Sequence, residues 1–280
     1  MERYLANIVD NIAVANFRYA NGSHWNEIMQ YLEQEIRGLG HELIIQRWQN
    51  PEGRIFKNLI VQIQGQVDET YILGAHYDSF EDTPGADDNA SAVAVLLGVL
   101  KSLPPEIKPH YTWEFVFYAC EEPPYFGTQD MGSYIHASSV NANQIKCMIC
   151  LEMVGFYSDE PKSQEYPFSL LKWIYGDRGN FLLGVSNYQS RKEARKIMNV
   201  LQGLDNSFYR KLLLPIPISG LDWSDHRSYW QKNMPALMLT DTAMFRNKNY
   251  HTPTDLPSTL NYKKMSKLTL DLVQLIQMNI

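Results

Sequence analysis

The chain has 280 residues, of which 45% are hydrophobic and 20% charged, which is ordinary for a folded globular protein. It carries 25 lysine and arginine residues against 31 aspartate and glutamate residues, a formal charge of −6 with no basic block, so nucleic acid is not expected as a partner. The longest apolar runs, such as 92–100, are far shorter than the roughly 20 residues of a membrane span, so no membrane is expected as a partner.

The N-terminus lacks the features of a secretory signal. A short positive segment followed by a continuous apolar stretch is missing, and Asp10 and Asn11 interrupt the first apolar residues. We therefore expect a cytoplasmic protein, or a secreted one if a leader has been removed. Nothing in the sequence indicates an oligomeric state.

Hydrophobic periodicity predicts two helices at the start of the chain and three strands after them. Apolar residues recur at helical spacing in 5–15 and 25–36, and two glycines close the second run. Apolar segments separated by turn residues then predict strands at 43–47, 58–63 and 71–74. A loop at 79–87 leads into a helix of small residues, 90–97, whose alanines and valines allow close packing on a sheet.

The rest of the chain continues to alternate strands with helices. The pattern predicts strands at 112–120, 145–153, 181–185 and 235–240, and helices at 129–137, 191–201 and 262–278. Segment 161–179 has no clean period, and we place it in a loop over the site. No linker or repeat divides the sequence, so we expect a single α/β domain over 1–280. Its architecture is a three-layer sandwich, with helices flanking a central mixed β-sheet of about eight strands.

Three cysteines, Cys120, Cys147 and Cys150, lie in apolar strand-like segments. Their odd number and this setting favour free thiols that pack as small hydrophobic side chains. The alternative is a metal or redox site at Cys147-x-x-Cys150. It is disfavoured because no second pair of cysteines exists and a strand turns positions three apart to opposite faces.

Polar residues at the ends of the predicted strands are the candidates for chemistry, because active sites of α/β proteins gather at the carboxyl ends of strands. His76 and Asp78 follow the strand 71–74. They are two residues apart, so they share a face and the carboxylate can orient the ring. Asp88 opens the helix of small residues, where capping the helix is the alternative role.

Three further segments carry candidate ligands. Glu121 and Glu122 end the next strand, where diverging side chains can serve one site as ligand and base; a solvated pair is the alternative. Glu152 lies inside an apolar strand, so a cation is expected beside it. His251 follows Tyr250 far downstream. Histidines and carboxylates without thiolate suit zinc, and a carboxylate can bridge two metal ions.

In this order, the motifs resemble the co-catalytic zinc exopeptidases. That family includes bacterial leucyl aminopeptidases and glutamate carboxypeptidase and is related to the glutaminyl cyclases. The resemblance covers about 58–260 and rests on His76-Tyr77-Asp78-Ser79, Gly85-Ala86-Asp87-Asp88-Asn89, Glu121-Glu122, Glu152-Met153-Val154-Gly155, Ser224-Asp225-His226 and Tyr250-His251-Thr252.

The resemblance implies a metallopeptidase with two Zn²⁺ per chain and a peptide as substrate. The implied zinc ligands are His76, Asp88 as the bridging carboxylate, Glu122, Glu152 and His251. Glu121 is implied as the general base for metal-activated water, with Asp78 and Tyr250 as further catalytic residues. Tyr250 resembles a family tyrosine that donates to the developing oxyanion, and simple packing beside the site is its alternative. Asp225 and His226 are expected to support the site or line the substrate pocket.

Two departures from the family pattern bear on specificity. Glu152 stands where aminopeptidases of the family usually have Asp, and its longer side chain changes the room for a substrate amine. Asp87 stands where Asn is also frequent, and we expect it either to contact the amine or to be solvated. Pocket walls are expected from loops such as 156–179 and 204–209.

We therefore expect a zinc-dependent exopeptidase, an aminopeptidase that hydrolyses the N-terminal residues of peptides. One alternative is a glutaminyl-cyclase-like acyltransferase with one zinc. The other is a metal-free binding module of the same fold.

Overall fold

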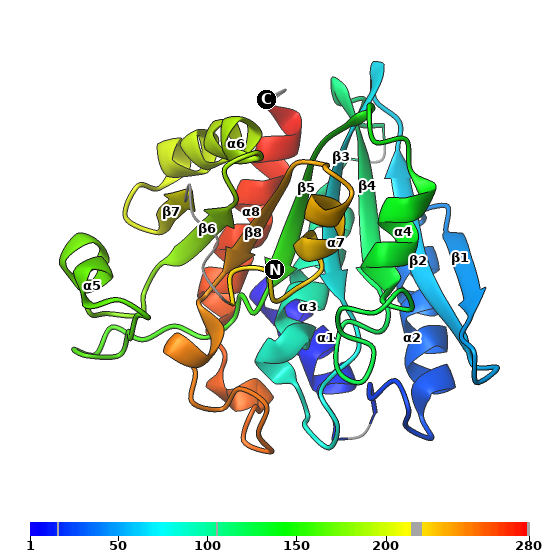
Figure 1. Cartoon of the computed structure of the whole chain (residues 1–280), viewed down its shortest axis with the longest axis horizontal. Coiled ribbons are helices and arrows are strands. Elements are labelled where there is room, and N and C mark those ends of the chain that lie inside the picture. Colours follow the sequence, from blue (N-terminus) through cyan, green and yellow to red (C-terminus); the bar gives the residue numbers. More distant parts are fainter. Residues whose placement is uncertain (16, 105, 214–219, 279–280) are drawn as a thin grey trace.

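The centre of this computed structural model is an eight-stranded mixed sheet (Figure 1). The structure describes residues 1–15, 17–104, 106–213 and 220–278. In spatial order the strands are β1 (Ile44–Gln49), β2 (Ile55–Ile63), β4 (Tyr111–Tyr118), β3 (Val67–His76), β5 (Ile145–Glu152), β8 (Ala236–Thr240), β6 (Leu182–Ser186) and β7 (Tyr209–Leu213). Strands β4, β3, β5 and β8 pair in parallel, whereas β1 with β2, β2 with β4, and β8 with β6 pair antiparallel. The expected mixed sheet is confirmed.

Helices lie on both faces of the sheet (Figure 1). One face packs on α1 (Glu2–Ile12), α2 (Trp25–Gly38), α3 (Ala92–Ser102), α6 (Arg191–Leu204) and α8 (Tyr262–Gln277), and the other on α4 (Gly132–Ser139) and α7 (His226–Gln231). Successive residues of β3 alternate between the two apolar clusters: Tyr71 and Leu73 belong to one and Ile72 to the other. The three-layer arrangement predicted from the sequence is thus present.

Helix α3 is buried on all sides over residues 92–100, as its small residues predict. A Cβ atom added at Gly98 would lie 3.0 Å from side-chain atoms of both Leu5 and Thr269, so α1 and α8 approach this helix closely. No helix in the described parts of the chain is both long and apolar enough to cross a membrane.

The parallel strands position the candidate site because their carboxyl ends meet at one edge of the sheet. Strand β3 ends at His76, β5 ends at Glu152, and β4 ends three residues before Glu121. The wide turn η1 (Ala86–Ser91) follows β3 and carries Asp88. Residues far apart in the sequence are thereby brought to one place.

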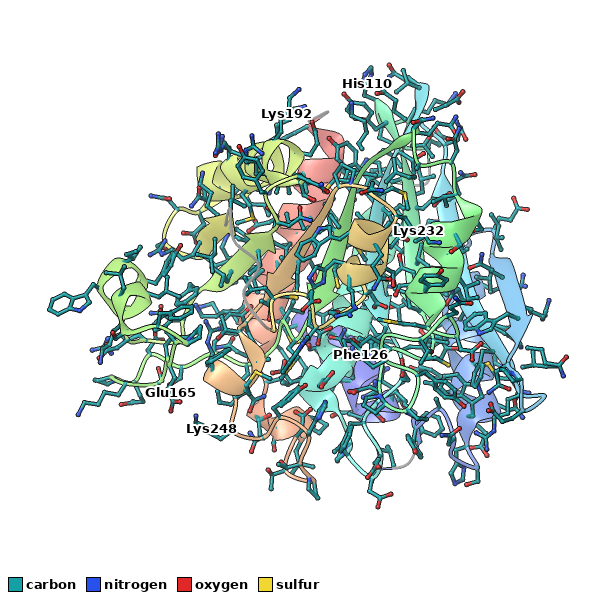
Figure 2. All side chains as sticks on the ribbon, in the orientation of Figure 1. His110, Phe126, Glu165, Lys192, Lys232 and Lys248 are labelled. Atoms are coloured by element: carbon teal, nitrogen blue, oxygen red, sulfur yellow. The ribbon has the colours of Figure 1, made fainter. Side chains whose placement is uncertain are left out.

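Three elements differ from the sequence-based expectation. The sequence predicted no strand in the segment of β7 and no helix in the segment of α7. The expectation of a loop at 161–179 is wrong in part, because this segment contains α5 (Ser169–Tyr175). The Tyr175 hydroxyl donates to the Lys211 carbonyl at 2.8 Å, and Glu165 pairs with Lys248 at 2.8 Å (Figure 2). The Tyr175 contact places α5 beside β7, and α5 lies at the side of the molecule (Figure 1).

Candidate metal centre

Two groups of ligand atoms meet at the carboxyl ends of the parallel strands. In the first, His76 Nε2 lies 3.4 Å from Asp88 Oδ1 and 3.3 Å from Glu152 Oε2. In the second, His251 Nε2 lies 3.2 Å from Asp88 Oδ2 and 3.2 Å from Glu122 Oε1. Asp88 offers one carboxylate oxygen to each group. The structure thus brings together all five residues that the sequence nominates as ligands.

Four of the atoms that face each other in these groups lack hydrogen bonds. His76 Nε2, Asp88 Oδ1, Glu122 Oε1 and His251 Nε2 are buried and have no hydrogen-bond partner in the described part of the chain. Buried polar atoms without partners are costly, and imidazole nitrogen with carboxylate oxygen is a donor set that zinc prefers. The residues present therefore fit two metal ions that share Asp88.

The pKa values of the cluster show how strongly these groups interact. Burial lowers the pKa of His251, but Asp88 and Glu122 outweigh burial and raise it to about 10. Burial raises the pKa of Glu122 to about 8, and the charge of Asp88 adds to the rise. Burial also lowers the pKa of His76, but carboxylates led by Glu152 raise it well above its ordinary value. Metal ions would therefore displace bound protons here.

The side chains around Asp88 explain why the turn η1 is held in place. Asp255 accepts hydrogen bonds from the backbone N–H groups of Asp87 at 2.9 Å and Asp88 at 3.1 Å. The Asn89 side chain donates to the Leu151 carbonyl and accepts from the Met153 N–H, both at 3.0 Å. The turn is thus tied to the strand end that carries Glu152. Asp88 makes no capping hydrogen bond to α3, so the alternative role of helix cap is wrong.

Asp78 connects the end of β3 to the turn after β4. Its backbone oxygen lies 3.2 Å from His76 Nδ1, closer than its carboxylate at 3.5 Å. The carboxylate accepts hydrogen bonds from the N–H groups of Glu121 at 3.1 Å and Glu122 at 2.9 Å. Glu121 and Glu122 are only 6% and 4% exposed, so the alternative of a solvated pair is wrong.

Glu121 lies beside the ligand groups without belonging to either. Its Oε2 atom is 3.9 Å from His76 Nε2, and its side chain lines the cavity in front of the cluster. Burial raises the pKa of Glu121 well above its ordinary value, although the charge of His76 opposes the rise. A carboxylate in this position can exchange a proton with a molecule in the cavity.

Two aromatic rings hold His251. Its imidazole stacks on Phe80 with ring centroids 4.1 Å apart, and on Tyr250 with centroids 3.8 Å apart. Tyr250 also lines the cavity in front of the cluster. Burial raises the pKa of its hydroxyl strongly, so the phenol stays protonated and can donate a hydrogen bond.

Two adjoining cavities open onto the cluster. The first has a volume of about 340 Å³. It is lined by four acidic residues, Asp88, Glu121, Glu122 and Glu152, and by Pro123, Phe126, Trp223, Tyr250 and His251; Figure 2 labels Phe126. The second, of about 90 Å³, shares Glu152, Trp223 and Tyr250 with the first. It adds the apolar side chains Val185, Leu221, Met238, Met244 and Phe245. Neither of the loops from which walls were expected, 156–179 and 204–209, lines these two cavities.

The expectation for Asp87 is also wrong. Its side chain is fully buried, so it is not solvated. One carboxylate oxygen accepts from the Gly155 N–H at 2.9 Å and the other from the Asn247 side chain at 2.8 Å, and Asp87 lines neither cavity. Both oxygens are therefore engaged in holding the fold around the centre, and neither faces a substrate amine.

Asp225 and His226 lie behind the cluster. Both are fully buried, and neither lines a cavity beside it. Burial raises the pKa of Asp225 to about 7, whereas the His226 ring bonds to the Leu221 carbonyl at 2.7 Å. The cysteines are free and buried, as predicted.

Sequence reasoning missed three residues that touch this centre. The Ser224 hydroxyl donates to Glu152 Oε2 at 2.6 Å, and the motif Ser224-Asp225-His226 was the signal that could have found it. Asp255 follows His251 by four residues, within a polar stretch that gave a weak signal. Arg18 contacts the loops that carry His76 and Asp88, and no sequence pattern singled it out.

Comparisons with known proteins identify the family of the chain. The model for Peptidase family M28 matches residues 58–276. Uncharacterized protein YfbL of Escherichia coli K12 is 40% identical over 232 residues, 80% of this chain and 71% of that protein. Leucine aminopeptidase 1 of Aspergillus clavatus is 28% identical over 253 residues, 84% of this chain and 59% of that protein.

Solved structures share the fold at low sequence identity. The LapA aminopeptidase of Legionella pneumophila aligns over 99% of this chain and 71% of its own, with a TM-score of 0.76 and 16% identity. Porphyromonas gingivalis glutaminyl cyclase aligns over 100% of this chain and 99% of its own, with a TM-score of 0.73 and 16% identity. The family match spans most of the chain and includes all the clustered residues, so the protein is a member of peptidase family M28.

Proposed function

We propose that the protein is a zinc-dependent aminopeptidase that removes N-terminal residues from peptides. The observation that carries the proposal is the pair of ligand groups that share Asp88. His76 and Glu152 would hold one zinc ion, and Glu122 and His251 the other. The same fold occurs in LapA, an aminopeptidase of Legionella pneumophila.

In peptide hydrolysis, Glu121, Tyr250 and Asp78, which lie outside the ligand groups, would each have a separate role. Two bound zinc ions would lower the pKa of the attacking water and polarise the scissile carbonyl. Glu121 takes a proton from that water and passes it to the leaving amine, since its carboxylate faces the cavity beside both groups. Tyr250 donates a hydrogen bond to the developing oxyanion. Asp78 holds the ring of His76 and the turn of Glu121 in position.

The charges around the cavities favour the amino end of a peptide. Recognition of a terminal carboxylate commonly uses arginine or lysine, and no such side chain lines either cavity in the described part of the chain. Four acidic residues line the first cavity instead, so no positively charged side chain opposes a substrate ammonium group there. We therefore favour an aminopeptidase over a carboxypeptidase.

The second cavity supports an apolar N-terminal residue. Most of its added side chains are apolar, with only two threonines among them, and it joins the first cavity at Glu152, Trp223 and Tyr250. An aliphatic side chain placed there would exchange water for apolar contacts. Leucine or methionine should be preferred over a charged residue.

A glutaminyl cyclase is the second candidate function, and two structural observations favour it. Its fold aligns with nearly the whole chain, and Asp88, Glu122 and His251 alone form a complete group for one zinc ion. The first group, with His76 and Glu152, favours the peptidase, because a single zinc ion at the other group would leave the buried atoms His76 Nε2 and Asp88 Oδ1 without a partner.

The test is a substrate panel with defined metal content. Leucine p-nitroanilide should be hydrolysed, chelation should abolish the reaction and Zn²⁺ should restore it, whereas N-acetyl-leucine p-nitroanilide should stay intact. His251→Ala should lose both zinc and activity, and His24→Ala, at an exposed histidine outside the centre, should lose neither. Cyclisation of a glutaminyl peptide without leucine release would favour the cyclase, and full hydrolysis by metal-free protein would contradict the proposal.

A further inference from the structure

Arg18 is a fully buried arginine that uses its whole guanidinium group on backbone carbonyls. Its Nε atom donates to Ile12 at 3.0 Å, at the end of α1. One terminal nitrogen donates to Tyr77 and Asp78, both at 3.2 Å, and the other donates to Pro84 at 3.0 Å and to Gly85. Five carbonyl oxygens around one planar group match the five donors of arginine, and lysine has only three.

The four carbonyls beyond α1 belong to two of the segments that carry candidate ligands, those of His76 and Asp88. Tyr77 and Asp78 directly follow His76, and Gly85 precedes Asp88 by three residues. The packing is tight, since a Cβ atom added at Gly85 would lie 2.5 Å from the Arg18 side chain. Arg18 therefore fixes the start of one ligand-bearing segment relative to the other.

No carboxylate pairs directly with Arg18 among the described residues, although a buried charge is costly to leave unpaired. Burial lowers its pKa to about 10, and the charges of Asp88, Asp255 and Asp78 oppose that shift. The side chain thus stays positively charged at neutral pH, next to a centre that would hold divalent cations. Its charge alone would repel zinc, so any benefit to zinc binding must come from its hydrogen bonds.

We propose that Arg18 is a positioning residue for the zinc centre, whose planar group sets the spacing between His76 and Asp88. The inference rests on the zinc centre of the proposed function. Arg18 affects zinc binding in two opposite ways: its hydrogen bonds favour zinc binding and its charge disfavours it. Arg18→Lys separates them, because lysine keeps the charge and cannot span all five carbonyls.

The experiment measures zinc affinity without any peptide, by competition with a chromophoric chelator. Arg18→Lys should bind zinc at least about tenfold more weakly than the parent, because several hydrogen bonds to carbonyls are lost. Arg246→Lys is the matched control. Arg246 is also buried and donates to Gln164 and to the Phe156 carbonyl, but it donates to neither the segment of His76 nor that of Asp88, so the zinc affinity of Arg246→Lys should stay near that of the parent.

Circular dichroism of the chelated variants establishes that each is folded. If Arg18→Lys is unfolded without zinc, the midpoint of zinc-induced folding replaces the competition measurement. Zinc binding by Arg18→Lys as tight as that of Arg246→Lys, or tighter, would overturn the inference. A parent that binds two zinc ions but hydrolyses no peptide would overturn the proposed function alone. A parent that binds no zinc would overturn both.

Discussion

Glu121 and Glu122 are adjacent and chemically identical, yet their surroundings predict that they fail in different ways when changed to Gln. Glu122 Oε1 lies 3.2 Å from His251 Nε2 within a ligand group, whereas Glu121 lies outside both groups. Their backbone N–H groups share the Asp78 carboxylate, so each substitution leaves the turn anchored and serves as the matched control for the other.

Glu121→Gln should keep zinc, and its turnover should be about 10²–10⁴-fold lower than that of the parent, which is the usual contribution of a positioned base. Glu122→Gln changes a carboxylate that we propose as a direct zinc ligand and should weaken zinc binding by more than about 100-fold, since loss of an outer-sphere partner alone costs 10–100-fold. Metal analysis after dialysis against a graded chelator series, beside turnover of leucine p-nitroanilide, measures both. Zinc loss from Glu121→Gln with retention in Glu122→Gln would refute the assignment.

Three further predictions concern the surroundings of the centre. Ser224→Ala removes the 2.6 Å hydrogen bond to Glu152 and should cost about 1.5–3 kcal/mol of zinc binding, read from chelator competition; unchanged affinity would contradict it. Phe80→Ala removes one ring stacked on His251 and should speed zinc dissociation, measured by stopped-flow chelation, whereas an unchanged rate would show that the ring only packs. Burial lowers the pKa of His136 to about 4, so protonation favours the unfolded chain below its ordinary pKa of 6.5. Relative to His136→Gln, the metal-free parent should therefore lose about 1.4 kcal/mol of stability per pH unit on acidification from pH 6 to 4.5, and parallel urea-unfolding profiles would contradict this.

The sequence predicted the fold, and also that the candidate ligands lie together, because both depend on short local patterns. Parallel strands place their carboxyl ends together, so a polar residue that interrupts an apolar run, such as Glu152 at the end of β5, marks the site directly. The roles given to Glu121 and Asp88 came from the order of the motifs and remain proposals.

Other features depend on contacts that no local pattern records. Arg18 acts through backbone carbonyls some sixty residues away, and the residues that it touches carry no chemical signature. Strand β7 is short and reads Tyr-Arg-Lys-Leu-Leu, with no alternation to predict a strand. Asp87 resembled a site residue because of its neighbour, and only the Gly155 and Asn247 contacts identify it as a structural group.

Zinc-edge anomalous diffraction from crystals of the zinc-loaded protein tests the central claim most directly. The two ligand groups predict two anomalous peaks on either side of the Asp88 carboxylate. One peak lies beside His76 and Glu152, and the other beside Glu122 and His251. A single peak at the second group would contradict the two-zinc centre and favour the cyclase, and no peak at either group would contradict a zinc enzyme altogether.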